Sequence, residues 1–333
     1  MYYSLVCTGI GKQQYKLEKI KKLKESFVLV EVIKATICGS DYMVLHGIHP
    51  YKKYPAILGH EFIGKIIDAN DTEFNINDMV TSLSYGYCGK CDQCKKEYFN
   101  HCVKKITYNT FGSSGAFTKH MIVHRNSLLT LPKAQDNQLF VISEPLSIVV
   151  HAFNKIKINK SSRLLIIGAG AMGLLSAIYY SEYTDGSNLI IVEHDKSRRK
   201  FAQDMGFEVI SDINTVPSDY FNILIVAGGN KFDINKAMKI ITNNSLLVLI
   251  SYFDANNEID MNTIVKKEIT IKGSFLSSKI DLLDSINILY KSLNNNSLFN
   301  KIITNEIKFS ELEEYMGKHI SNGKVLIDSL GVL

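Results

Sequence analysis

The feature that most constrains the fold is a glycine-rich turn between an apolar strand and an apolar helix. Residues 163–167 (RLLII) run into residues 168–173 (GAGAMG), and the apolar stretch 174–180 follows. A second apolar strand, residues 189–192, ends in Glu193. A strand, a glycine turn, a helix, a second strand and an acidic residue in this order form the dinucleotide-binding fingerprint of a Rossmann unit.

Each glycine of this turn has its own task. Gly168 permits the tight turn, Gly170 lets a pyrophosphate approach the backbone at the helix N-terminus, and Gly173 lets the helix pack closely on the strand. Glu193 is expected to accept hydrogen bonds from the adenosine ribose and to repel a 2′-phosphate, which predicts NAD rather than NADP. Arginines that follow it are the competing signal, because arginine pairs with phosphate. The predicted cofactor-binding residues are Gly168, Gly170, Met172, Gly173, Glu193 and Arg198, with Arg199 as a further candidate phosphate partner.

The rest of the chain indicates a second region of different character. Residues 27–33 and 62–67 read as strands, and Asn and Asp residues mark turns between 70 and 78. After residue 193, further alternation of strand and helix as far as Phe275 predicts a parallel, doubly wound sheet. At 333 residues the chain is long for one core, which favours two domains. The predicted class is therefore α/β, with an additional β domain.

Four of the six cysteines lie in one short segment. Cys88, Cys91, Cys94 and Cys102 have the spacing C-x2-C-x2-C-x7-C, and four thiolates this close can surround one tetrahedral zinc ion. The alternative, four unrelated surface thiols, does not suit a chain with so few cysteines. Such a site has no vacancy for a substrate, so the predicted role of its zinc is structural.

A second set of candidate ligands is spread along the sequence. The segment from Cys38 to Glu61 begins with a thiol and ends in Gly-His60-Glu61, and thiolate, imidazole and carboxylate are ligands of a catalytic zinc. Glu144 lies among apolar residues, where a carboxylate is costly unless it is paired or bound to metal, so it is a candidate to join Cys38 and His60. The alternatives are a buried cysteine and a core histidine that never meet, and a carboxylate that only stabilises a helix start.

Composition and charge exclude several classes of function. The net charge of +5 and the scattered lysines lack the dense basic cluster of a nucleic-acid-binding surface. No apolar run is long enough to cross a bilayer, and the first residues do not resemble a signal peptide. We therefore expect a cytoplasmic protein with no nucleic-acid or membrane partner, in which the cysteines are thiols and metal ligands.

With these residues placed, the chain resembles the zinc-dependent medium-chain dehydrogenase/reductase family over nearly its whole length. It is most similar to the polyol, sugar-acid and threonine dehydrogenase branch, because Glu144-Pro-Leu-Ser stands where liver-type alcohol dehydrogenases carry a cysteine. The motifs that carry the resemblance are Cys38-Gly-Ser-Asp41, Gly59-His60-Glu61, the four-cysteine segment, Glu144-Pro-Leu and the glycine fingerprint with Glu193.

The resemblance implies a fold and an assembly. A GroES-like catalytic domain would comprise residues 1–146 and 276–333, and a Rossmann domain would comprise residues 147–275. One closed thiolate site and one mixed-ligand site predict two zinc ions per chain, and the resemblance implies a homodimer or homotetramer. In the catalytic site Cys38 and His60 would be ligands, and the third ligand would be Glu61 or Glu144.

The resemblance also implies a reaction, with one departure. The expected activity is oxidation of a secondary alcohol on a polyol, sugar acid or related small molecule, with NAD as hydride acceptor. Ser40 would take the proton, and the predicted catalytic set is Ser40, Glu61 and His46. Met43 occupies the place of the usual relay histidine, and methionine carries no proton. Two alternatives stay open: a threonine-type amino-alcohol dehydrogenase, and a non-catalytic sensor of zinc and dinucleotide.

Overall fold

The computed structural model describes residues 1–133, 138–184, 188–228, 234–253, 258–318 and 322–333. These residues form two units. One combines Met1–Ser147 with Leu276–Asn295 and Ile303–Leu333, and the other combines Ile148–Phe275 with Asn296–Ile302. The first is built mainly on antiparallel sheets and the second on a parallel sheet with helices. The α/β class expected from the sequence is therefore confirmed.

The described part of the first unit contains a seven-stranded sheet in the order β10-β6-β5-β3-β18-β17, with β9 also paired to β3. A three-stranded sheet, β2-β1-β4, and the pair β7-β8 accompany it. The C-terminal strand β18 lies inside the large sheet, between β3 and β17, so residues far apart in sequence become neighbours there. The strands are β1 (Tyr2–Gly9), β2 (Lys12–Glu18), β3 (Phe27–Thr36), β4 (Ala56–Ile57), β5 (Glu61–Asp68), β6 (Met79–Ser82), β7 (Tyr85–Gly86), β8 (Ile106–Thr107), β9 (His120–His124), β10 (Leu128–Thr130), β17 (Ile303–Lys308) and β18 (Lys324–Asp328).

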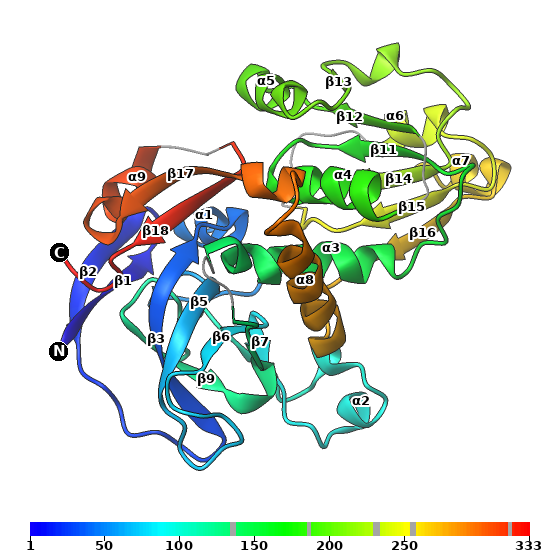
Figure 1. The fold of residues 1–333 in the computed structure, drawn as a ribbon. Coiled ribbons are helices and arrows are strands. Elements are labelled where there is room, and N and C mark those ends of the chain that lie inside the picture. Colours follow the sequence, from blue (N-terminus) through cyan, green and yellow to red (C-terminus); the bar gives the residue numbers. More distant parts are fainter. Residues whose placement is uncertain (134–137, 185–187, 229–233, 254–257, 319–321) are drawn as a thin grey trace. The chain divides into compact units, whose positions relative to one another are not determined.

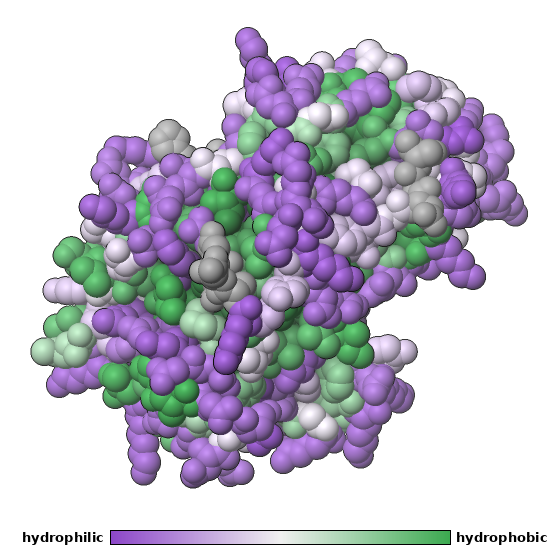
Figure 2. All heavy atoms as spheres, in the orientation of Figure 1, coloured by the Kyte–Doolittle hydropathy of each residue, from purple (hydrophilic) through white to green (hydrophobic). Residues whose placement is uncertain are grey.

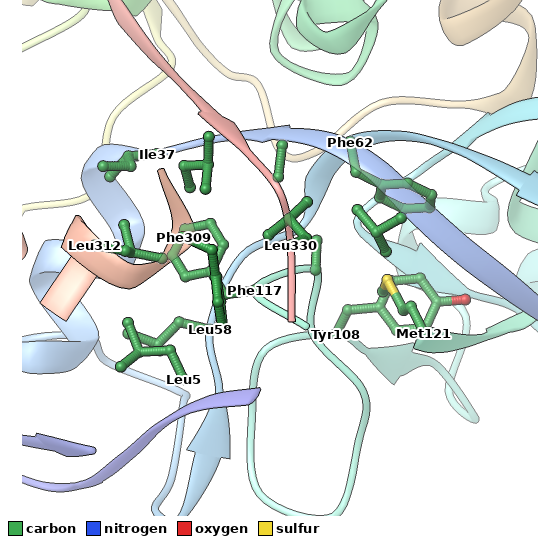
Figure 3. Packing of buried hydrophobic residues seen from close by; sticks show 14 of the residues in the cluster. Leu5, Ile37, Leu58, Phe62, Tyr108, Phe117, Met121, Phe309, Leu312 and Leu330 are labelled. Atoms are coloured by element: carbon green, nitrogen blue, oxygen red, sulfur yellow. The ribbon is translucent and has the colours of Figure 1, made fainter. Parts of the chain in front are cut away.

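The hydrophobic core of this unit draws on both ends of the chain. Figure 3 shows Leu5, Leu58 and Phe117 together with Phe309 and Leu312, and all five are fully buried. Apolar side chains from the C-terminal segment thus fill the same core as those from the first strands. Because burial of apolar surface is the main stabilising term in folding, the unit depends on residues 303–333.

The second unit is a parallel sheet in the order β13-β12-β11-β14-β15-β16, with β12 to β16 stacked in this order in Figure 1. The middle residues of β11 are completely buried, as expected for a parallel strand covered on both faces. Strand order reverses at β11, and ligands of such sheets bind at the carboxyl end of that strand. The elements are β11 (Arg163–Ile167), α4 (Ala171–Tyr183), β12 (Asn188–Val192), α5 (Lys196–Asp204), β13 (Val209–Ile210), β14 (Ile223–Val226), α6 (Ile234–Ile240), β15 (Leu246–Leu249), α7 (Met261–Lys267) and β16 (Thr270–Gly273).

The helix that carries Glu144 begins just before it. Helix α3 spans Ser143–Phe153, so Glu144 and Pro145 lie in its first turn. Proline is tolerated there because the first N–H groups of a helix have no intrahelical acceptor. The other helices of the first unit are α1 (Gly39–Leu45), α2 (Asp92–Lys95), α8 (Lys279–Ser292) and α9 (Leu312–Lys318).

The surface drawn in Figure 2 is mostly hydrophilic, with apolar residues in scattered patches. The large aliphatic and aromatic side chains of the two cores are instead buried. Within the described ranges, every helix falls short of the length and apolar content that a bilayer crossing requires.

Candidate active site and metal centres

The four-cysteine lobe, which we define as Cys88, Cys91, Cys94 and Cys102, gathers its thiols around one point. Their Sγ–Sγ distances include values of 3.5, 3.9 and 4.0 Å. A zinc–sulfur bond of about 2.3 Å implies sulfur separations of roughly 3.8 Å in a tetrahedron, so the lobe fits a zinc ion. Hydrogen bonds from the backbone N–H groups of Cys94 and Val103 lower the pKa of the Cys91 thiol to about 6, which favours the thiolate that a metal needs.

A second group of candidate ligands forms where β3 runs antiparallel to β5. The register places Thr36 opposite Glu61. Cys38 follows β3 as the N-cap of α1, and His60 immediately precedes β5, so strand pairing brings the two residues together. One ligand atom each from Cys38, His60 and Glu61 lies within 4.8 Å of the others. We call these three residues the mixed centre.

The mixed centre carries more negative charge than its burial favours. Burial, followed by the nearby Glu61 carboxylate, raises the pKa of the Cys38 thiol to about 12. A buried anion needs a cation beside it, and a divalent metal ion favours the thiolate form. The donor set therefore fits a zinc ion. Ser40 lies beside it, because its backbone N–H donates to Cys38 Sγ at 3.5 Å.

The Glu61 carboxylate is held by two partners that sequence patterns did not reveal. One oxygen accepts a hydrogen bond from the Thr36 hydroxyl, and the other pairs with the ammonium of Lys324 on β18. Lys324 is 2% exposed and Glu61 is completely buried. Burial alone would lower the pKa of Lys324, but the Glu61 carboxylate raises it, so the Lys324 ammonium keeps its charge. Both Glu61 oxygens are thus engaged.

Glu144 lies close to the mixed centre. It is 3% exposed in the first turn of α3. Burial raises the pKa of the Glu144 carboxyl above its usual range. The His60 side chain and a hydrogen bond with Ser84 oppose this shift, and the Glu61 carboxylate adds to it. Its oxygens are outside the group of ligand atoms within 4.8 Å, so the choice between Glu61 and Glu144 as third ligand stays a prediction.

His60 is oriented by an outer shell of polar groups. The Asn109 side-chain nitrogen lies 3.0 Å from His60 Nδ1 and donates to Asp41 Oδ1 at 2.8 Å. Because Nδ1 is engaged, Nε2 is the ring nitrogen available to a metal. Gly59 must be glycine here: its φ is +82°, and a Cβ would lie 2.4 Å from the Phe117 ring.

The structure separates the histidines that follow α1. His46 is exposed, and its Nδ1 pairs with the Tyr42 carbonyl at 2.8 Å, so the structure does not bring it into the mixed centre. His49 is half-buried, and its Nδ1 accepts hydrogen bonds from the backbone N–H groups of Tyr51 and Lys52. Burial, with positive charge from Lys52 and His60, lowers the pKa of His49 to about 4.

The glycine turn of the second unit has the tight geometry that its sequence predicts. Gly168 has a φ of +98°, and a Cβ on Gly173 would lie 1.8 Å from the Gly168 carbonyl oxygen, so no other residue fits there. The Glu193 carboxylate, 3% exposed, accepts hydrogen bonds from the backbone N–H groups of Ala169 at 2.8 Å and Asp195 at 2.9 Å. Glu193 is thereby fixed against the turn, in which Met172 is half-buried.

The two arginines after Glu193 differ in what they contact. Arg199 donates to the backbone carbonyl of Glu193 at 3.0 Å, which ties its guanidinium to the protein. Arg198 Nη1 lies 4.0 Å from the position of a Cβ on Gly170, so it stands over the turn that is predicted to receive the pyrophosphate. Of the two, Arg198 is the one that lies next to the glycine turn.

Comparison with known proteins adds independent information. The sequence matches the alcohol dehydrogenase GroES-like domain over residues 24–133. It is 28% identical over 305 residues to a sorbitol dehydrogenase of Halalkalibacterium halodurans, covering 86% of each chain. It is 27% identical to a D-arabitol-phosphate dehydrogenase of Enterococcus avium, covering 91% of this chain and 90% of that one. Galactitol-1-phosphate dehydrogenase from Escherichia coli has the same fold, with a TM-score of 0.86 at 20% identity over 98% of this chain and 99% of that one.

These similarities extend through both units. The GroES-like match covers most of the segment that carries the four-cysteine lobe and the mixed centre, and the curated relatives also include the dinucleotide-binding turn. The matching domain and the curated relatives together support the zinc-type medium-chain alcohol and polyol dehydrogenase family for this chain.

Proposed function

We propose that the protein oxidises a secondary alcohol of a polyol, sugar acid or related hydroxy compound, with NAD as hydride acceptor and two zinc ions per chain. The observation that carries the proposal is the mixed centre, where a thiol, an imidazole and a carboxylate converge within 4.8 Å. The relatives named above are polyol dehydrogenases, which favours a polyol-like substrate over the amino alcohol of the threonine-type alternative.

In this proposal each residue near the mixed centre has one role. Cys38 and His60 hold the catalytic zinc, together with Glu144 or Glu61. A zinc ion bound there supplies Lewis-acid polarisation of the alcohol oxygen. The Ser40 backbone N–H contacts Cys38, and the Ser40 hydroxyl would accept the alcohol proton while it passes its own proton on to water. A bound nicotinamide would supply the hydride acceptor. Thr36 and Lys324 fix Glu61, so a change of ligand at Glu61 requires these contacts to loosen.

The predicted cofactor is NAD rather than NADP. Glu193 is held rigidly next to the glycine turn, where its charge opposes a 2′-phosphate. Arg199 is engaged with a backbone carbonyl, so only Arg198 would be available to offset that repulsion. A preference of roughly 10- to 100-fold in kcat/KM is the expected scale for one such clash.

Assembly and compartment complete the proposal. The six cysteines, all in the described ranges, form no disulfide there and suit a reducing compartment, which supports a cytoplasmic location. We infer a homodimer or homotetramer, as is usual in the family, and light scattering on the purified protein tests it.

The deciding experiment is a panel of polyols, sugar acids and threonine, followed by NADH absorbance with and without a chelator. Turnover that the chelator abolishes and added zinc restores is the expected result. A protein that binds zinc and NADH but turns over nothing would instead be the non-catalytic sensor. Elemental analysis should find two zinc ions per chain; one ion would remove one of the two centres.

A further inference from the structure

A lysine next to the mixed centre lacks a carboxylate partner. Lys52 lies in the loop after α1 and is half-buried. Its ammonium contacts the side-chain oxygen of Asn109, a neutral amide. In the part of the chain that the structure describes, Lys52 forms no ion pair, whereas the buried Lys324 is paired with Glu61. The burial of Lys52 is therefore not offset by a direct ion pair.

Lys52 is connected to the catalytic machinery through Asn109. The oxygen of this amide faces Lys52, while its nitrogen contacts both His60 and Asp41. Asp41, whose charge acts on Lys52, is held by other groups. Asp41 already accepts hydrogen bonds from the backbone N–H groups of Cys38 and Gly59, and from Asn109.

The electrostatics agree with this placement. Burial lowers the pKa of Lys52, and charges on Asp41, Cys38 and Glu144 oppose that shift. Two of those groups are candidate zinc ligands, whose charge a bound zinc ion would neutralise. With zinc bound, Asp41 would be the one charge of these three that is left, and it reaches Lys52 through the Asn109 amide rather than by a direct ion pair in the described part of the chain.

We propose that Lys52 binds an anionic group of the substrate, a carboxylate or a phosphate, and so selects sugar acids or phosphorylated polyols over neutral polyols. An ammonium has three N–H donors, and Asn109 takes one of them. The two that are left suit the oxygens of an oxyanion, because charge-assisted hydrogen bonds are the strong ones. This inference rests on the proposed function and names the substrate class within it.

The test compares three six-carbon substrates that differ in charge: D-sorbitol, D-gluconate and D-sorbitol 6-phosphate. The zinc-loaded enzyme is assayed with NAD, as wild type and as Lys52→Met, which keeps the length of the side chain without its charge. We expect wild type to prefer an anionic substrate. Lys52→Met should reduce the ratio of kcat/KM between anionic and neutral substrates by about 10- to 100-fold. The ratio cancels any loss of folded enzyme, metal or cofactor.

Lys53→Met is the matched control, because Lys53 is the exposed neighbour in the same loop. It should leave the ratio unchanged. A loss confined to D-gluconate identifies a carboxylate, and a loss confined to D-sorbitol 6-phosphate identifies a phosphate. An equal loss on all three substrates would mean that Lys52 only braces Asn109, and a wild-type preference for D-sorbitol would also overturn the inference.

The proposed function can fail separately. If no member of the panel is turned over, calorimetric binding of the same three compounds to the zinc-loaded protein with NADH replaces the assay. Tighter binding of an anionic compound that Lys52→Met abolishes would support the anion site. Binding that ignores the substitution, or no preference for the anionic compounds, would reject it.

Discussion

The four-cysteine lobe and the mixed centre are assembled in opposite ways. The lobe takes all its thiols from residues 88–102, and Cys88 and Cys91 are partly exposed. The mixed centre depends on two paired strands, and its His60 and Glu61 are buried. Its polar surroundings come from distant segments, including Thr36, Asn109 and Lys324. Local chain geometry thus closes the lobe, whereas the packed sheet of the first unit holds the mixed centre.

The difference explains why the two centres are suited to different tasks. Four thiols satisfy a tetrahedral zinc ion and leave no place for a substrate. The mixed centre supplies fewer ligands and surrounds them with groups that orient them. Substitutions of ligands in the lobe should therefore lower stability, and substitutions of ligands in the mixed centre should lower activity. Four substitutions test that division.

The largest expected effect is that of Cys38→Ser. It removes a predicted ligand of the catalytic zinc, and Lewis-acid stabilisation is worth several kcal/mol, so kcat/KM should fall at least roughly 10³-fold. Bound zinc should drop from two ions to one per chain, while the melting temperature changes little. Steady-state kinetics and elemental analysis measure both. Retained activity would show that the mixed centre is not catalytic.

Lys324→Met tests whether the outer shell of the mixed centre also carries stability. The change leaves the Glu61 carboxylate buried without its cation, which should cost about 3–5 kcal/mol in the free energy of unfolding. Lys34→Met is the control, because Lys34 pairs with the half-exposed Glu306 at 2.6 Å and should cost about 0–1 kcal/mol. Denaturant unfolding compares them. Similar losses would mean that the Lys324–Glu61 pair is not a stabilising element.

Cys94→Ser should lower the stability of the protein, which Cys38→Ser should leave nearly unchanged. The buried Cys94 is one of four thiols that hold the zinc, and metal binding contributes folding free energy. We expect the melting temperature to fall by roughly 4–8 °C, or about 2 kcal/mol. Turnover of the folded fraction should persist, as calorimetry and kinetics on one sample can verify. A loss of kcat with unchanged stability would reverse the assignment.

The smallest effect should come from Met43→His, which restores a titratable group two residues after Asp41. If proton release limits the reaction, kcat near neutral pH should rise by up to about 10-fold, the usual lower range for general acid–base catalysis. The gain should fade as pH falls and the new imidazole is protonated. A pH profile identical to that of wild type would mean that water or another group already releases the proton.

The two centres also show what sequence can and cannot predict. The lobe could be predicted because its four ligands lie within one short segment. The glycine turn could be predicted because Gly168, Gly173 and Glu193 occur in a fixed order. The approach of Cys38 to His60 required the register of β3 and β5. In the sequence, the ligand types of the two residues suggested this approach and the family resemblance supported it.

Other contacts had no signal in the sequence. In the sequence, Lys324 looks like any lysine at the start of a strand, and Asn109 looks like any turn residue. Their contacts with Glu61 and His60 appear only in the folded structure. His46 was chosen for its nearness in sequence, but the structure leaves it exposed on the Tyr42 carbonyl. Residues that are close together in a loop need not face the same way, so nearness in sequence was a weak argument. The catalytic role of His46 stays a prediction.

The place of β18 inside the sheet has a consequence for protein synthesis. Lys324 and Glu61 are 263 residues apart, and everything between them must leave the ribosome before they can meet. At about 5–20 residues per second, that interval is roughly 15–50 s. During this time Glu61 has no ammonium partner, and the large sheet lacks the strand that lies between β3 and β17. The large sheet of a nascent chain is therefore incomplete until β18 has emerged, and the end of β3 that pairs with it stays unpaired on that edge for most of synthesis.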